Sequence, residues 1–455
     1  MTLPVRAFRP FISTQNSEPS QPITRLFVLV VLFAAVVLSA ASPALATTYL
    51  AVGTCEPAYT SFSTIQSAVN AAPGSGSTTI YVCPGTYPEQ VQIIGKKITL
   101  KGVASGSSNA AIIVPPAGGL VANATSTFGG PQIEAMVLVQ NTTATIEYVT
   151  VDGTNNLTTC GQDPIGIFYQ NASGTITRTN VIHVQVVGGF GCQGGLGIYV
   201  ESGATTVPPN LSPEAPSTVT VTYNNVQDYD KNGITANGTP TGTASNVNVT
   251  LTHNTVMGAG QVNDNAQNGI QLYGANGSVS DNIIDGNWYT VGTYAATGIL
   301  IIQSYAPTIT SNTISNSNVG IYLASVNPDD TDNAAVTSNS IIATHLFDAI
   351  VACANKSTIT SNTVNFADES GVNVASGCGD ATPTDSLTSN TINGACAGVL
   401  IDPPATAAQT GTVYYNVGTQ VLTTSSDSCT PALVKRQGGQ KSIPAASPAG
   451  GAKKL

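Results

Sequence analysis

The sequence predicts a parallel β-solenoid, on three observations: a composition poor in charge, a repeat of short strands, and a recurring asparagine. Only 8% of the 455 residues are charged, whereas 45 are glycine and 26 are proline. Ser, Thr, Asn and Gly replace the Glu, Lys and Arg that fill helical surfaces, which argues against a helical protein. The hydrophobic fraction of 42% is near the globular norm and argues against a disordered chain.

A six-residue motif occurs nine times between residues 146 and 401. It begins with Ile, Val or Leu, ends with Ile or Val, and carries Asn at the fourth position in the last seven copies, as in Ile309–Ile314 and Ile359–Val364. A second short run follows each copy and opens with a small residue and then Ile or Val, as in Gly320-Ile321. Such units cannot bury their apolar faces alone, so they must stack, with equivalent strands pairing in parallel about 4.8 Å apart. The Asn column fits a bend between strands, where Asn tolerates the left-handed conformation and can bond to its neighbours in the stack.

The first 46 residues have the features of a secretory signal. Arg6, Arg9 and Arg25 precede the apolar run from Leu26 to Ala41, and Ala44-Leu45-Ala46 follows with small residues where a signal peptidase cleaves. The alternative is an uncleaved anchor, although a full span needs about 20 residues. We therefore expect a secreted or cell-surface protein with no membrane contact beyond this signal. The net charge of −10 argues against a nucleic-acid partner.

Residues 47–434 are expected to form one solenoid domain. Residues 47–103 would supply the N-terminal cap and first coil, with a capping helix over residues 62–72 that Ser63 and Gln66 begin as a capping box. Residues 146–401 would hold the nine coils and residues 402–434 a C-terminal cap. Residues 435–455 have no apolar pattern and are expected to be a disordered tail. Nothing in the sequence indicates an oligomer, so a monomer is favoured.

The eight cysteines fit a disulfide framework in an oxidising compartment. Proximity in the sequence suggests Cys55 with Cys83 and Cys160 with Cys192, although four bridges allow 105 connectivities. No paired CxxC with zinc spacing is present, so zinc is not expected.

Residues 62–102, which include Phe62-Ser-Thr-Ile-Gln and Ile80-Tyr-Val-Cys-Pro-Gly, resemble the opening of pectin methylesterases. The later repeats resemble the parallel β-helix repeats of the wider pectin-lyase-like superfamily. The resemblance implies a right-handed, three-faced β-helix and action on acidic or neutral polysaccharides. The catalytic segments of pectin methylesterases and the Gly-His-Gly of polygalacturonases are absent, so neither activity is expected here.

The first candidate catalytic cluster comes from stacking the coils. Counting back from the small residue that opens the second strand, Asp348 lies one residue before Ala349, while Glu369 and Asp368 lie two and three residues before Gly371, with His345 nearby. Acids on adjacent coils would lie about 5 Å apart, which is the carboxyl separation of retaining glycosidases. Acids two coils apart would lie about 10 Å from each other, near the upper end of the carboxyl separation in inverting glycosidases. Solvated surface acids, or acids that hold Ca²⁺, are the alternatives.

A second candidate cluster crowds the segment before Gly233, and a third lies in a later loop. The second contains Asp228, Asp230 and Lys231, with Asp264 in the corresponding loop of the next coil; the alternative is a surface ion-pair cluster of little energetic value.

The third cluster, Asp329, Asp330 and Asp332, has oxygen ligands for Ca²⁺, in a loop expected to be solvated otherwise. No cofactor is expected to be required, and Ca²⁺ is the one metal that the sequence leaves open. His183 and His253 lie in different coils at different offsets and predict no metal pair. Trp288 could stack on a sugar ring, but packing against the coil is the simpler expectation.

These features predict a secreted β-helix protein that binds or processes extracellular polysaccharide. An enzyme of this kind would be a polysaccharide hydrolase or lyase. The alternative is a non-catalytic structural or adhesive extracellular solenoid, because the fold does not decide function.

Overall fold

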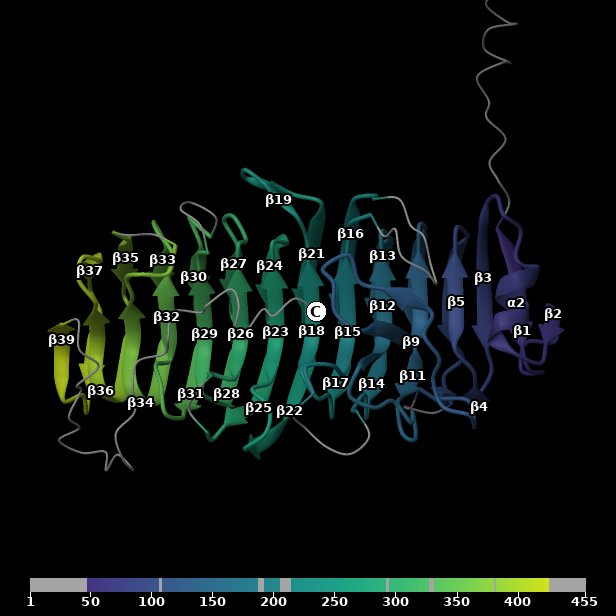
Figure 1. Cartoon of the computed structure of the whole chain (residues 1–455), viewed down its shortest axis with the longest axis horizontal. Helices are drawn as coiled ribbons and strands as arrows, with labels where there is room; N and C mark the ends of the chain where they lie inside the picture. The colour runs from purple at the N-terminus through teal and green to yellow at the C-terminus, as the bar shows by residue number, and fades with distance from the viewer. Residues whose placement is uncertain are drawn as a thin grey trace, which may run out of the picture. The chain divides into compact units, whose positions relative to one another are not determined.

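The computed structural model describes residues 47–105, 109–186, 192–204, 214–291, 294–326, 331–379 and 382–424. Within residues 47–424 the described chain winds through three stacks of parallel strands that continue from coil to coil (Figure 1). The signal segment and the tail that the sequence predicts lie outside the described residues.

The first stack is a sheet of fourteen strands. In spatial order its strands are β2 (Thr60–Phe62), β1 (Thr48–Val52), β3 (Ser77–Val82), β6 (Lys97–Gly102), β10 (Thr143–Glu147), β13 (Ser173–Thr177), β16 (Ser217–Thr222), β21 (Val247–Thr252), β24 (Asn276–Ser280), β27 (Thr308–Thr310), β30 (Ala335–Thr337), β33 (Thr358–Thr360), β35 (Thr384–Thr388) and β37 (Thr406–Thr410).

The second and third stacks join into one sheet because two long strands, β34 (Thr363–Val374) and β36 (Thr391–Ile401), run through the corner between them. The remaining strands of the second stack are β4 (Gly85–Pro88), β7 (Ala111–Val114), β11 (Val149–Asp152), β14 (Asn180–Ile182), β17 (Asn225–Gln227), β22 (Thr255–Val262), β25 (Ile283–Tyr289), β28 (Thr313–Ser317), β31 (Ser340–Thr344) and β38 (Val413–Tyr415).

The third stack follows the second in each coil. Its other strands are β5 (Val91–Ile94), β9 (Gln132–Gln140), β12 (Gln162–Gln170), β15 (Leu196–Glu201), β18 (Asn232–Asn237), β23 (Asn268–Tyr273), β26 (Thr297–Ile302), β29 (Val319–Ala324), β32 (Ile350–Cys353) and β39 (Thr419–Thr423). Two short pairs are antiparallel: β8 (Ala124–Thr125) with β9, and β19 (Pro240–Thr241) with β20 (Ala244–Ser245).

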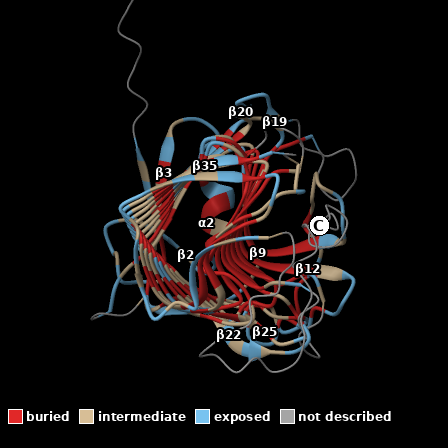
Figure 2. Cartoon of the chain, turned by 90° about the vertical axis from the view of Figure 1, so that its left-hand side faces the viewer, coloured by how far each residue is buried: buried red, intermediate tan, exposed pale blue. Residues whose placement is uncertain are grey.

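The core is a continuous apolar column inside the coils. One Ile or Val of each third-stack strand points inward and pairs in register with the next, as in Ile234 with Ile270 and Ile270 with Ile299. All three side chains are fully buried. Viewed along the axis, buried residues line the inside of the coils and exposed residues gather at the turns (Figure 2). At about 25 cal/mol per Å² of buried apolar surface, this column is the main source of stability.

The predicted Asn column is confirmed as a buried ladder. Its members are Asn224, Asn254, Asn282, Asn312, Asn339, Asn362 and Asn390, each only 1–2% exposed. In each step Nδ2 donates to Oδ1 of the next Asn at 2.9–3.0 Å and to a backbone carbonyl of the preceding coil. The ladder fixes the corner between the first and second stacks.

The predicted helix is α2 (Ile65–Ala71), and its capping differs from the expectation. Thr64, not Ser63, is the N-cap, and its side chain accepts from Ser67 N at 3.1 Å. The Glu89 carboxylate accepts from two further N–H groups of the first turn, at 2.8 Å each. Ile65, Ala68 and Val69 join the core, at the N-terminal end of the solenoid (Figure 1). A capping function for α2 stays a prediction.

Both suggested disulfides are confirmed, and a third joins Cys353 to Cys378. Cys396 is also disulfide-bonded. Within the described part of the chain, no helix is long and apolar enough to cross a bilayer.

Candidate functional site

The structure places Asp348, from the first predicted cluster, in a structural position. It is 1% exposed and its Oδ1 accepts from Ser370 N at 2.9 Å and Ser370 Oγ at 2.6 Å. Its Oδ2 accepts from Asn373 Nδ2 at 2.9 Å. These bonds hold β34 where its register shifts between Ala367 and Ser370. Asp348 therefore fastens a bulged strand to the coil before it.

His345 and Asp368 of the same cluster do come together. Asp368 Oδ2 accepts from the backbone N–H of Leu346 at 2.7 Å. The His345 ring stacks on Trp288 with centroids 3.8 Å apart, so one face of Trp288 is already covered. Burial lowers the pKa of His345, and the charge of Asp368 opposes that shift. Glu369 lies beside them and donates its N–H to Phe347 O at 3.3 Å.

The second predicted cluster divides into an inner and an outer part. Asp230 is 1% exposed and accepts from Val186 N at 2.8 Å, and burial, with a smaller contribution from Asp264, raises its pKa to about 6. Lys231 Nζ donates to Ala266 O at 2.8 Å, and burial lowers its pKa to about 8. Asp264 is exposed. Asp228 belongs to the outer part.

A further inner carboxyl, Asp163, was missed from the sequence. Asp163 and Asp230 each lie three residues before the Gly that opens the second strand, two coils apart, with Gly194 at the same place between them. Gly195 N donates to Asp163 Oδ1 at 2.9 Å, while burial, with a smaller contribution from Glu201, raises the pKa of Asp163 to about 7. A Cβ on Gly194 would lie 2.9 Å from Asp163 Oδ1, so a larger residue there would force the Asp163 carboxyl group to shift.

The third predicted cluster is only partly described, because Asp329 and Asp330 lie outside the described residues. The expectation that Asp332 is solvated is wrong: it is 1% exposed and accepts from Asn355 N at 3.1 Å and Lys356 Nζ at 3.4 Å. These bonds tie two successive coils together. In the ranges that the structure describes, no group of three or more His, Cys, Asp or Glu side chains is arranged to hold a metal ion.

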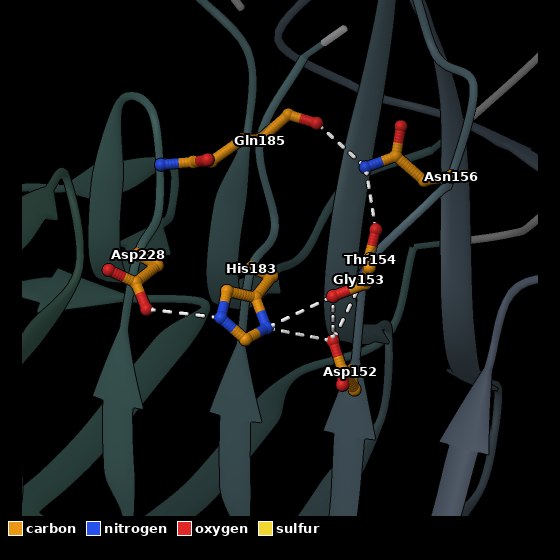
Figure 3. Close-up of polar contacts among 7 residues, drawn as sticks. All are labelled: Asp152, Gly153, Thr154, Asn156, His183, Gln185 and Asp228. Atoms are coloured by element: carbon orange, nitrogen blue, oxygen red, sulfur yellow. Dashed lines mark hydrogen bonds and ion pairs between the residues drawn. The ribbon is translucent and has the colours of Figure 1, made fainter.

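Asp228, the outer residue of the second cluster, forms a constellation with Asp152 and His183 on three successive coils. Asp152 ends β11, His183 follows β14 and Asp228 follows β17. His183 Nδ1 lies 2.9 Å from Asp152 Oδ1, and His183 Nε2 lies 3.4 Å from Asp228 Oδ2. Figure 3 shows the imidazole between the two carboxylates. The side chains of His183 and Asp228 are each 44% exposed and that of Asp152 is 24% exposed, so the group is open to solvent.

Local backbone geometry and neighbouring bonds orient this constellation. His183 and Asp228 have φ of 57° and 55°, the left-handed region in which the chain turns out of the second stack. Thr154 donates its N–H and its hydroxyl to Asp152 Oδ1 at 3.0 and 2.7 Å. Asn156 Nδ2 donates to Gly153 O and to Gln185 O, which ties the two backbones together behind the site (Figure 3).

The two carboxylates differ in environment. Burial by itself would raise the pKa of Asp152, but the hydrogen bonds from Thr154 and His183 outweigh it and lower that pKa. Asp228 is the more exposed of the two, and its Oδ2 lies 3.4 Å from His183 Nε2. Two coils separate the carboxylates, or about 10 Å of stacked backbone, near the range of roughly 6.5–9.5 Å between the carboxyl groups of inverting glycosidases.

The model of the family described as "Right handed beta helix region" matches residues 212–403. The chain is a right-handed parallel β-helix. The right-handed parallel β-helix expected from the sequence is thereby confirmed as the fold. Among curated proteins, no sequence matches the chain.

Several solved structures resemble this β-helix at low identity. The GH136 lacto-N-biosidase from Eubacterium ramulus is 11% identical, with a TM-score of 0.48, over 83% of this chain and 68% of that one. The A-module of the mannuronan C-5 epimerase AlgE4 from Azotobacter vinelandii is 12% identical, with a TM-score of 0.40, over 78% and 92%. The Dettilon tailspike protein is 13% identical, with a TM-score of 0.40, over 77% and 62%. Similarity at this level carries no information about substrate or mechanism.

Proposed function

We propose that this protein acts outside the cytoplasm on a polysaccharide and hydrolyses it with inversion at the anomeric carbon. The observation that carries the proposal is the solvent-open pair of carboxylates, Asp152 and Asp228, two coils apart with His183 between them. The disulfides support the extracytoplasmic setting.

The two carboxyl groups take different roles in this proposal. Asp152, whose pKa is lowered, stays ionised and is the general base that accepts a proton from the attacking water. Asp228, in its protonated form, is the general acid that gives its proton to the leaving glycosidic oxygen. The water oxygen forms a bond to the anomeric carbon as the glycosidic bond breaks, and solvent then restores both protonation states. His183 positions both carboxylates and touches neither bond.

The test is hydrolysis of a panel of neutral and acidic polysaccharides, followed by a reducing-end assay. Asp152→Asn and Asp228→Asn should each lower kcat about 10²- to 10⁴-fold, the usual share of general acid or base catalysis. Asp281→Asn is the matched control, since Asp281 is an exposed turn residue on another corner of the solenoid, and it should leave kcat unchanged. Equal effects of all three substitutions would contradict the proposed roles.

The second candidate function is a non-catalytic structural or adhesive solenoid. It is favoured by the buried acids, since Asp348 and Asp332 serve as acceptors that join successive coils. The two candidates separate in the same assay. A wild-type protein that hydrolyses no polysaccharide in the panel is the structural solenoid, and one whose hydrolysis depends on Asp228 is the enzyme.

A further inference from the structure

A column of rings and cations lies at the opposite edge of the strands that carry Asp152, His183 and Asp228. Tyr148, Arg178, Tyr223 and His253 occupy the same corner position in four successive coils, each with φ between 49° and 58°. The Arg178 guanidinium carbon lies 5.7 Å from the Tyr148 ring centre and 5.1 Å from that of Tyr223. The Tyr223 and His253 rings stack at 4.7 Å. Tyr223 is 51% exposed, and Arg178 and His253 are also exposed.

Arg178 is the unpaired cation of the column. Only three basic residues lie between residues 109 and 424. Lys231 donates to Ala266 O and Lys356 to Asp332, whereas the Arg178 guanidinium has no carboxylate within ion-pair distance among the described residues. In a chain with a net charge of −10, an exposed arginine held between two tyrosine rings and left without an acid is a preformed site for an anion.

The acidic constellation does not cancel this positive charge. Arg178 and His183 are five positions apart in the sequence, about 16 Å of extended chain. That is twice the Debye length of about 8 Å at physiological ionic strength. Near the column, Lys101 adds a second cation 5.7 Å from the Tyr148 ring, although Glu147 pairs with it at 3.0 Å. The edge around Arg178 is therefore positive, whereas the edge that carries Asp152 and Asp228 is acidic.

The surface between the edges is polar. Thr150, Asn180, Asn225 and Thr255 pair in register across β11, β14, β17 and β22. The next residue in each of these strands is a buried Val, so by the alternation of a strand these four point away from the core. Asn180, Asn225 and Thr255 are partly exposed, whereas Thr150 is only 7% exposed and its hydroxyl donates to Asn109 O, so the first three are the ones open to a ligand. Hydroxyl and amide side chains of this kind can bond to sugar hydroxyls.

We infer that the column of Tyr148, Arg178, Tyr223 and His253 is a glycan-binding subsite for a sugar that carries an anionic group, a carboxylate or a sulfate ester. Arg178 pairs with the anion and Tyr223 packs against the sugar ring. The inference rests on the proposed action on polysaccharide and adds a recognition site to it, one strand length from the carboxylates.

Binding is measured by affinity electrophoresis and calorimetry with matched pairs of polymers: polygalacturonate against its methyl ester, and dextran sulfate against dextran. We expect the wild type to bind the anionic polymer of at least one pair more tightly than its neutral counterpart. The pair in which this preference occurs shows whether the subsite recognises a carboxylate or a sulfate ester. Arg178→Gln should lower the affinity for that polymer at least tenfold and leave the neutral member unaffected. Arg178→Lys should recover only part of the loss, because lysine lacks the planar fork. Tyr223→Ala should weaken both members.

Lys97→Gln is the matched control, because Lys97 is an exposed base in β6 of the first stack. It should leave the preference unchanged. An Arg178→Gln protein that keeps the wild-type preference overturns the inference, as does a wild type that prefers the neutral member of both pairs. Asp152→Asn and Asp228→Asn should keep the anion preference while losing hydrolysis, so failure of the subsite and failure of the proposed hydrolysis give different results.

Discussion

Two histidines lie at the same corner of the solenoid, between the second and third stacks, and their surroundings are opposite. His183 follows β14, is open to solvent and lies between two carboxylates. His345 follows β31, is stacked on Trp288, and has its pKa lowered by burial. Near the first, Asp228 is exposed; near the second, Asp348 is saturated with donors. The same position in the coil can thus hold a histidine of a solvent-open site or a histidine that packs against its neighbours. The exposure of the side chain and the residues it contacts determine the outcome.

The largest stability effect is expected in the coils around His183, at the buried Asp163. Its folded pKa of about 7 lies above the unfolded value, so the fold favours the protonated form. The associated stability is fully present below about pH 4 and is lost as the pH rises to about 7, a change of about 4 kcal/mol. Urea unfolding of wild type and Asp163→Asn at pH 4.5, 6 and 7.5 measures it. Asp163→Asn should reduce the change of the free energy of unfolding with pH over this range. If it does not, the pKa assignment is contradicted.

In the coils around His345, Asp348→Ala should lower the free energy of unfolding by about 3 kcal/mol, because the Ser370 and Asn373 donors lose their buried carboxyl acceptor. Hydrolysis per folded molecule should not change. Asp264→Ala, at an exposed position, is the control and should shift stability by less than about 0.5 kcal/mol. If Asp348→Ala melts like wild type, the acid is not a structural acceptor.

The sequence allowed the fold to be predicted well because stacking repeats the same pattern in every coil. The inward Ile and Val and the Asn ladder follow from the nine copies, and two disulfides were predicted from the proximity of their cysteines in the sequence. The site was predicted less well, because offsets were counted back from the third-stack strand, across turns of variable length. Counted forward from the first strand, His183 and Asp228 both fall seven residues after their motif's first residue, Ile176 and Val221. That count would have brought His183 and Asp228 together, whereas Asp152 falls six residues after Ile146.

The other misplaced acids have separate physical reasons. The offset of Glu369 falls within the register shift in β34, which the motif does not reveal. The bonds that occupy Asp348 come from Ser370 and Asn373 in the next coil and cannot be read from its own segment. The burial of Asp332 depends on Asn355 and Lys356 in the next coil and cannot be read from its own loop.

The Asn ladder lies at the corner between the first and second stacks, away from both histidines, and gives a reference for the stability of the stacked coils. Asn312→Ala removes the bonds of Nδ2 to Val279 O and Asn339 Oδ1 and leaves Asn282 without its acceptor. We expect a loss of about 1 to 3 kcal/mol. Thermal melting and polymer binding are measured together, and binding should not change. A variant as stable as wild type would mean that the ladder contributes nothing to the stack.

The smallest effects compare the two histidines directly. His183→Phe removes exposed ion pairs and should cost less than about 1 kcal/mol while lowering hydrolysis. His345→Phe keeps the stack on Trp288 and should leave hydrolysis intact. Because the folded pKa of His345 is lowered, its stability contribution is present above about pH 6.5 and is lost as the pH falls. His345→Phe should therefore gain stability relative to wild type in melts at pH 5, and no gain would contradict the burial of His345.

The most direct test of the account is the stereochemistry of hydrolysis together with its dependence on Asp228. Wild type, Asp228→Asn and Asp348→Asn are incubated with the polysaccharide that the panel identifies, and proton NMR follows the anomer released. The account predicts an inverted product, a loss of about 10² or more in rate for Asp228→Asn with unchanged melting temperature, and the wild-type rate per folded molecule for Asp348→Asn. A retained anomer, or a loss of rate confined to Asp348→Asn, would contradict it.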